Sequence, residues 1–220
     1  MRTFVIGDIH GVYQAFLQCL KKADFNKHKD YLICLGDVCD RGPQTRECID
    51  ELLSIQNCTY LLGNHDAWTL EWAIKGRTIT EWWEQGGSET IASYKGTGMP
   101  KEHIQFLAQS PLWLLDKNRL FIHAGFDVDN GLEKTPKETL IWDRELLSKA
   151  MLLHRSCSQW KFGGYDEIFV GHTPTLTFDK DTPQKFCNVW AMDTGAGWHG
   201  KLTIMDVDTK EYWQSDSVPA

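Results

Sequence analysis

Three short apolar segments in the first third of the chain are each followed by glycine and then by aspartate or asparagine. They occupy residues 3–6, 31–35 and 59–62. Nearly continuous apolar runs of this length, ended by glycine, are typical of strands buried on both faces of a parallel sheet. Between them, apolar residues recur at helical spacing over 12–23 and 48–55. The pattern therefore predicts alternating strands and helices, with parallel strands in one sheet.

The remainder of the chain has a more mixed pattern. Apolar runs at 119–123, 166–172, 189–193, 201–207 and 211–214 predict further strands, with a final hairpin around Asp208 and Thr209. These strands can form a second sheet. Residues 80–94 are expected to begin as a helix that breaks at Gly86 and Gly87, because glycine weakens a helix interior.

Composition narrows the functional classes. The chain of 220 residues is long enough for a substantial core, and we expect one domain spanning residues 1–220. Its net charge of −7 argues against a general nucleic-acid binder. The first strand begins by residue 3 and no apolar run approaches the ~20 residues of a membrane span, so we expect a cytoplasmic protein without a membrane partner.

Cysteines and tryptophans give weaker expectations. The seven cysteines lack C-x-x-C spacing and are expected to be reduced, mostly buried residues. Cys39 lies inside a polar motif, where it could make a site sensitive to oxidants. Most of the ten tryptophans are expected in the core, with an exposed platform only around residues 81–87.

The polar motifs after the first three predicted strands carry the chemistry. They read Gly-Asp-Ile-His-Gly at 7–11, Gly-Asp-Val-Cys-Asp-Arg-Gly at 36–42 and Gly-Asn-His-Asp at 63–66. Ligands gather at the carboxyl ends of parallel strands, so Asp8, Asp37 and Asn64 should meet there. Mixed carboxylate, amide and imidazole ligands suit Mn, Fe or Zn better than Ca or Mg. Two later runs end in His123 and His172, which makes enough ligands for two metal ions.

The order of these motifs, followed by His-Ala-Gly at 123–125 and Gly-His-Thr at 171–173, resembles the phosphoprotein phosphatase superfamily of calcineurin-like metallophosphoesterases. The similarity is strongest to the small serine/threonine phosphatases of bacteria and bacteriophage lambda, and it extends from residue 7 to about residue 202. The resemblance implies an α/β fold, a four-layer sandwich of two mixed β-sheets flanked by helices. It also implies that residues 80–94 lie beside the catalytic face.

The same resemblance implies a ligand set for two divalent ions, with manganese favoured and iron or zinc as alternatives. One ion would be held by Asp8 and His10, and Asp37 would bridge both ions. The second ion would be held by Asn64, His123 and His172.

The resemblance further implies the catalytic roles. His65 would be the catalytic histidine, oriented by Asp40, and would protonate the departing alkoxide. Arg41 and Arg144 would bind phosphate oxygens, because planar guanidinium groups match them in a bidentate fashion. The two cations would acidify a shared water to hydroxide, which would attack phosphorus directly without a covalent enzyme intermediate.

Several assignments have a structural alternative. Asn64 could be a helix cap, and His123 and His172 could be buried histidines bonded to backbone. Arg144 could belong to a surface ion-pair cluster with its acidic neighbours. Trp198 and His199 follow an Asp-Thr-Gly segment that lies at the active-site rim in the related phosphatases, where they would contact the substrate; alternatively Trp198 is packed and His199 exposed. The remaining histidines are expected at the surface: His28, His103 and His154.

The substrate is the least determined property. A phosphoprotein, or another phosphomonoester, is the favoured substrate. A symmetrical diadenosine tetraphosphate hydrolase is the main alternative, because such enzymes share these motifs and often carry Arg-Gly-Pro, as at 41–43. Asp40 favours the phosphatase, because the alternative enzymes often lack an acid at this position. A non-catalytic phosphate-binding protein is disfavoured because the metal ligands and His65 are all retained.

Overall fold

The computed structural model describes residues 1–219 and contains two mixed five-stranded sheets. The first sheet has the order β10-β9-β1-β2-β3, in which β1 (Thr3–Ile6), β2 (Tyr31–Cys34) and β3 (Cys58–Tyr60) are parallel. Strands β9 (Thr203–Asp206) and β10 (Tyr212–Gln214) add antiparallel pairs beside β1. Both the parallel unit and the final hairpin predicted from the sequence are confirmed. The hairpin was expected in the second sheet, however, and it lies in the first, because β9 pairs with the distant strand β1, a pairing that local sequence does not specify.

The second sheet has the order β4-β5-β6-β8-β7. Its centre is parallel and consists of β5 (Arg119–Ile122), β6 (Glu167–Val170) and β8 (Val189–Ala191). Each edge is antiparallel: β4 (Trp113–Asp116) pairs with β5, and β7 (Gln184–Phe186) pairs with β8. The two edge strands were not predicted. Strand β7 lacks an apolar run, whereas β4 contains the short apolar run Trp113 to Leu115, a signal that could have indicated a strand.

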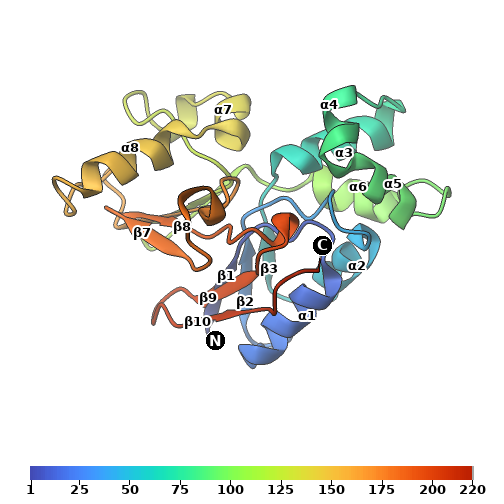
Figure 1. Cartoon of the computed structure of the whole chain (residues 1–220), viewed down its shortest axis with the longest axis horizontal. Coiled ribbons are helices and arrows are strands. Elements are labelled where there is room, and N and C mark those ends of the chain that lie inside the picture. The colour runs from blue at the N-terminus through green and yellow to red at the C-terminus, as the bar shows by residue number, and fades with distance from the viewer. Residues whose placement is uncertain (220) are drawn as a thin grey trace.

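Helices cover the outer faces of the two sheets (Figure 1). Helices α1 (Tyr13–Lys22) and α2 (Thr45–Leu53) share one apolar cluster with the first sheet. Helices α7 (Lys137–Trp142) and α8 (Glu145–His154) share another with the second sheet. Three more helices, α3 (Asn64–Lys75), α5 (Ser88–Ser93) and α6 (Lys101–Ala108), form a group beside α2. The predicted α/β architecture of two sheets flanked by helices is confirmed.

Alternate residues of the central strands face opposite layers. In β1, Phe4 and Ile6 pack toward the helices, while Val5 packs between the sheets. In β5, Phe121 faces the inter-sheet layer, where its ring stacks on Phe169 of β6 at 4.9 Å. Because both faces of these strands are buried, their sequences are continuously apolar and end where polar groups can reach the sheet edge.

The segment predicted to break at Gly86 and Gly87 is indeed kinked. It comprises α4 (Thr80–Trp82), a π-turn η1 (Trp83–Gly87) and α5. Gly86 has φ of 102°, a left-handed conformation that glycine adopts without steric cost. The kink places Gln85 in the wall of a cavity described below. That this is the catalytic face stays a prediction.

Several weaker expectations are wrong. His103 is buried, 2% exposed, and its Nε2 lies 2.9 Å from Asp50 Oδ1. Only Trp82 among the ten tryptophans is fully buried, since most lie at partly exposed positions. Burial raises the pKa of the Cys39 thiol well above its ordinary value, which disfavours the thiolate that oxidants attack.

Within residues 1–219, no helix has the length and apolar character needed to cross a membrane.

Candidate active site

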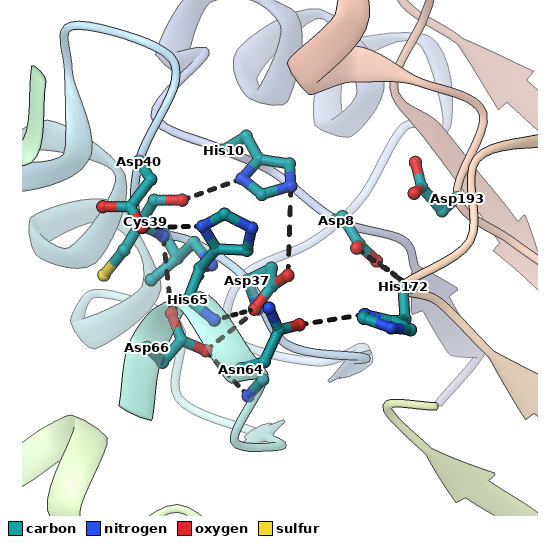
Figure 2. A network of polar contacts seen from close by, with 12 residues as sticks. Asp8, His10, Asp37, Cys39, Asp40, Asn64, His65, Asp66, His172 and Asp193 are labelled. Atoms are coloured by element: carbon teal, nitrogen blue, oxygen red, sulfur yellow. Dashed lines mark hydrogen bonds and ion pairs between the residues drawn. The ribbon is translucent and has the colours of Figure 1, made fainter. Parts of the chain in front are cut away.

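The carboxyl ends of the central strands converge on one buried polar cluster (Figure 2). Four of the six predicted metal ligands follow β1, β2 and β3, two of them after β1, and the other two follow β5 and β6 of the other sheet. The cluster thus lies where the same ends of both sheets meet. It contains all six predicted metal ligands, each buried: Asp8, His10, Asp37, Asn64, His123 and His172.

Asp66 holds two of these loops together, a role that was not predicted. Its carboxylate accepts hydrogen bonds from the backbone N–H groups of Asp37, Val38 and Gly63, at 2.9, 3.1 and 2.9 Å. It also accepts one from the Tyr60 hydroxyl at 2.6 Å. Asp66 occupies the third position of helix α3, where its carboxylate accepts the backbone N–H of the N-cap residue Gly63. One carboxylate therefore fixes the loop after β2 against the loop after β3.

Asp37 lies at the centre of the cluster and belongs to two groups of side chains that could hold a metal ion. One group is His10, Asp37 and His65, and the other is Asp37, His123 and His172. Asp37 Oδ2 lies 3.9 Å from His10 Nε2 and 3.4 Å from His123 Nε2. A shared carboxylate between two sets of imidazoles is the arrangement that a bridging ligand requires.

The ligand atoms of the second group converge on the amide of Asn64. Its Oδ1 lies 3.0 Å from His123 Nε2 and 2.9 Å from His172 Nδ1. Asp8 lies on the other side, where its carboxylate accepts the backbone N–H of His172 at 3.0 Å. The roles of Asp8 and Asn64 as ligands remain predictions, although both side chains lie at the site.

The outer nitrogens of two imidazoles are already bonded to backbone, which supports metal binding. His10 Nδ1 lies 2.8 Å from the Cys39 carbonyl, and His123 Nδ1 lies 2.7 Å from the Leu35 carbonyl. Since the outer nitrogen donates its proton, the Nε2 lone pair can face a cation. The donor set of imidazole, carboxylate and amide therefore fits a first-row divalent ion.

Burial and neighbouring charges shift the pKa values of several residues in the site. Burial opposes ionisation of Asp37, but the surrounding imidazoles, led by His123, hold the pKa of its carboxyl well below the ordinary value. Burial lowers the pKa of His10 and of His172 to about 3, so both imidazoles are neutral at pH 7, the form that can bind a metal ion. Burial raises the pKa of Asp193, also within the cluster, to about 6.

His123 behaves differently and leads to a prediction about metal binding. Burial lowers its pKa, but the carboxylates of Asp37 and Asp8 outweigh burial and raise the pKa to about 10. The metal-free imidazole is therefore protonated at pH 7, and a metal ion bound there must displace that proton. We expect Mn²⁺ binding to release at least one proton at pH 7, with affinity that increases as the pH rises toward 10.

Calorimetric titration with Mn²⁺ in buffers of different protonation enthalpy measures this release. His103→Asn is a suitable control, because its imidazole is buried outside the site and should leave the proton count unchanged. Metal binding without proton release at pH 7 would contradict the assigned charge state of His123.

A histidine–aspartate pair lies beside the metal-ligand cluster. His65 Nδ1 is 2.7 Å from Asp40 Oδ2, and both side chains are almost fully buried. Asp40 also accepts the indole N–H of Trp82 at 2.8 Å and the Thr90 hydroxyl at 2.7 Å. The helical segment 80–93 thus anchors the carboxylate that orients His65. The parts played by Trp82 and Thr90 were not predicted.

Both predicted arginines line a cavity of about 420 Å³ that opens onto this cluster. Arg144 Nε donates to His172 Nε2 at 3.3 Å, and within residues 1–219 neither arginine forms an ion pair with a carboxylate. The acidic neighbours of Arg144 instead bond within helix α8: Asp143 accepts the Leu146 N–H, and Glu145 pairs with Lys149. The alternative of a surface ion-pair cluster is therefore wrong, and two unneutralised guanidinium groups face the cavity.

The structure places the two predicted rim residues in different cavities. Trp198 is 52% exposed and lines the same cavity, as does Trp142. His199 does not line it; this residue borders a neighbouring cavity of about 510 Å³, and its Nδ1 lies 3.0 Å from the Pro219 carbonyl. His199 has φ of 63°, a left-handed conformation that glycine adopts more readily than histidine. Contact of either residue with substrate remains a prediction.

Known proteins are similar to this chain over most of its length. Serine/threonine-protein phosphatase 1 of Salmonella typhimurium is 27% identical over 209 residues, covering 92% of this chain and 90% of the relative. Bis(5'-nucleosyl)-tetraphosphatase PrpE (asymmetrical) of Bacillus cereus is 30% identical over 229 residues, covering 92% and 89%. The relatives therefore bear the names of two kinds of phosphoester hydrolase.

Solved structures share the fold. The crystal structure of a candidate diadenosine tetraphosphatase superposes with a TM-score of 0.74 at 17% identity, covering all of this chain and 95% of the other. Residues 1–198 match the calcineurin-like phosphoesterase family, a range that contains every residue of the polar cluster. The chain is therefore a member of the calcineurin-like phosphoesterase family.

Proposed function

We propose that this protein is a dinuclear metal-dependent phosphatase that hydrolyses phosphomonoesters, with phosphoserine and phosphothreonine in proteins as its substrates. One observation carries the proposal. A single cavity is lined by Asp37 and by imidazoles that could hold metal ions beside it, by His65, which Asp40 orients from behind, and by two arginines without acidic partners. An anion with three equivalent oxygens and a protonatable leaving atom matches this arrangement.

Different residues have different roles in the proposed hydrolysis. Arg41 and Arg144 bind and orient the phosphoryl oxygens, because both line the cavity and neither guanidinium is paired with a carboxylate. His65, held by Asp40, donates a proton to the oxygen that leaves phosphorus. Two divalent ions, with manganese favoured and iron or zinc as alternatives, supply positive charge against the phosphate and acidify the attacking water. Attack by water makes a covalent enzyme intermediate unnecessary.

A dinucleoside polyphosphate hydrolase is a second candidate. Trp142 and Trp198 are 38% and 52% exposed and line one cavity with the arginines, and indole faces can stack on nucleobases. The name of the Bacillus cereus relative favours the same substrate class, with asymmetrical cleavage in place of the symmetrical cleavage considered from the sequence. Asp40 and the name of the Salmonella typhimurium relative favour the phosphatase.

One comparison separates the two candidates. With Mn²⁺ present, we expect kcat/KM for a phosphoserine peptide to exceed that for diadenosine tetraphosphate by at least about tenfold, a difference of about 1.4 kcal/mol in transition-state binding. Product analysis with the dinucleotide distinguishes two ADP molecules from ATP plus AMP. A higher kcat/KM for the dinucleotide would favour the second candidate.

The cysteines bear on where the protein functions. All seven are free thiols in the structure, including the exposed Cys157. Free thiols are typical of proteins in reducing compartments. They support the proposal that the protein is cytoplasmic.

A further inference from the structure

Arg41 is held in an unusual position between two cavities. It follows Asp40 in the loop between β2 and α2, where its backbone has φ of 68°. Its guanidinium carbon lies 3.9 Å from the centre of the Trp198 ring. Arg41 borders the active-site cavity of about 420 Å³ and the neighbouring cavity of about 510 Å³. Its side chain is therefore part of the wall that divides them.

No acidic side chain neutralises this cation. Within residues 1–219, no carboxylate lies within ion-pairing distance of Arg41, and its buried Nε has no hydrogen-bond partner. Desolvation lowers the pKa of Arg41, and more distant carboxylates, led by Asp37, oppose the shift. A buried guanidinium nitrogen without a partner is costly unless an anion binds to it. Under the proposed function, that anion is the substrate phosphate.

Trp198 holds the guanidinium group of Arg41 in place, as a carboxylate partner otherwise would. A carboxylate would hold Arg41 in place but would also occupy the N–H donors that phosphate needs. An indole face attracts the cation through its ring electrons and leaves the N–H groups at the guanidinium edge free. The stack thus fixes the plane of Arg41 without neutralising its charge.

Two glycines allow the neighbouring segments to approach Arg41 closely from both sides. A Cβ atom on Gly86 would lie 2.2 Å from the Arg41 backbone nitrogen, and one on Gly197 would lie 2.6 Å from Arg41 Cδ. The loop that carries Trp198 is itself held by two hydrogen bonds. The Trp198 N–H donates to the Gly195 carbonyl at 2.8 Å, and the Gly195 N–H donates to Asp193 at 2.9 Å. Arg41 therefore lies between two segments that are far apart in the sequence.

We propose that Trp198 is a positioning residue that holds Arg41 against the phosphate-binding cavity. The proposal rests on the proposed function, because it takes phosphate as the anion that Arg41 binds. It differs from the expectation that Trp198 contacts the leaving group. A positioning residue should change phosphate binding by the same factor for every leaving group, and only when Arg41 is present.

A double-mutant cycle tests the proposal with Trp198→Leu, Arg41→Met and the double variant. The measured quantity is the affinity of inorganic phosphate for the Mn²⁺-loaded protein, by calorimetry, together with KM for para-nitrophenyl phosphate and a phosphoserine peptide. We expect Trp198→Leu to weaken phosphate binding about 3- to 30-fold, the range for a cation–π contact. The same change in the Arg41→Met background should have little effect, and Trp198→Phe should retain most of the affinity.

Two results would overturn the proposal. One is an equal effect of Trp198→Leu with and without Arg41, and the other is an effect that follows the leaving group, which would indicate direct substrate contact. Trp160→Leu is the matched control, because Trp160 is 51% exposed and lies outside both cavities. It should leave phosphate affinity and both KM values unchanged.

A second measurement needs neither metal nor substrate. Urea unfolding of the same four proteins gives the coupling between Arg41 and Trp198 directly. We expect the losses in the free energy of unfolding caused by the two single changes to be non-additive in the double variant. Strictly additive losses would show that Trp198 does not hold Arg41 in place. If the wild-type protein hydrolyses no phosphoester, the proposed function fails, whereas the unfolding cycle still decides whether Trp198 holds Arg41.

Discussion

Replacement of Asp37 by asparagine should remove nearly all turnover and lower the metal content of the purified protein. A neutral amide cannot balance two dications as a shared carboxylate can. Loss of one partner of a buried charge typically costs about 3–5 kcal/mol, so we expect kcat/KM to fall by at least about 10²-fold. Elemental analysis should find fewer than two metal ions per chain.

The Asp37→Asn variant should still fold. The side-chain oxygen Oδ1 accepts the His65 backbone N–H at 3.0 Å, and an asparagine oxygen can accept the same bond. Asp206→Asn is a matched control, because Asp206 is also buried and accepts backbone N–H groups in the turn after β9. The control should keep its activity and metal. Two metal equivalents together with full activity in Asp37→Asn would refute the bridging role.

The sequence predicted the centre of the site because each strand ends at its own motif. The apolar run of β1, the glycine after it and Asp8 are neighbours in the chain, and the same holds for β2 with Asp37 and for β3 with Asn64. Parallel pairing then brings the three strand ends together without further information. The polar cluster was predictable because local sequence and sheet topology are sufficient to place it.

The supporting contacts were not predictable by the same argument. The indole of Trp82 meets Asp40 across 42 residues, and His103 meets Asp50 across 53 residues. Such contacts depend on how α4, α5 and α6 pack against α2, and hydrophobic periodicity does not specify that packing. Asp66 did leave a local signal, since it stands three residues after Gly63, where an acidic side chain caps a helix.

Replacement of His65 by asparagine should separate acid catalysis from metal binding. The ring lies against Asp40 on one side and reaches the cavity, while the neighbouring Asn64 points toward His123 and His172. We therefore expect His65→Asn to keep two metal ions but to lose about 10²–10⁴-fold in kcat on phosphoserine, the usual range for general acid–base catalysis. The loss should be smaller on para-nitrophenyl phosphate, because its phenolate leaves without much protonation.

A second histidine–aspartate pair in the chain provides the control for His65. The imidazole of His103 is also buried, 2.9 Å from Asp50 and 3.0 Å from the Tyr94 hydroxyl, but it lies outside the cavity. His103→Asn should lower stability and leave the ratio of kcat values for the two substrates unchanged. Asp40→Asn should reproduce the His65→Asn pattern in weaker form, because the imidazole stays in place but is poorly oriented. Equal losses on both substrates in His65→Asn would mean that His65 stabilises the phosphoryl group or the attacking water, and its role as the proton donor would then be wrong.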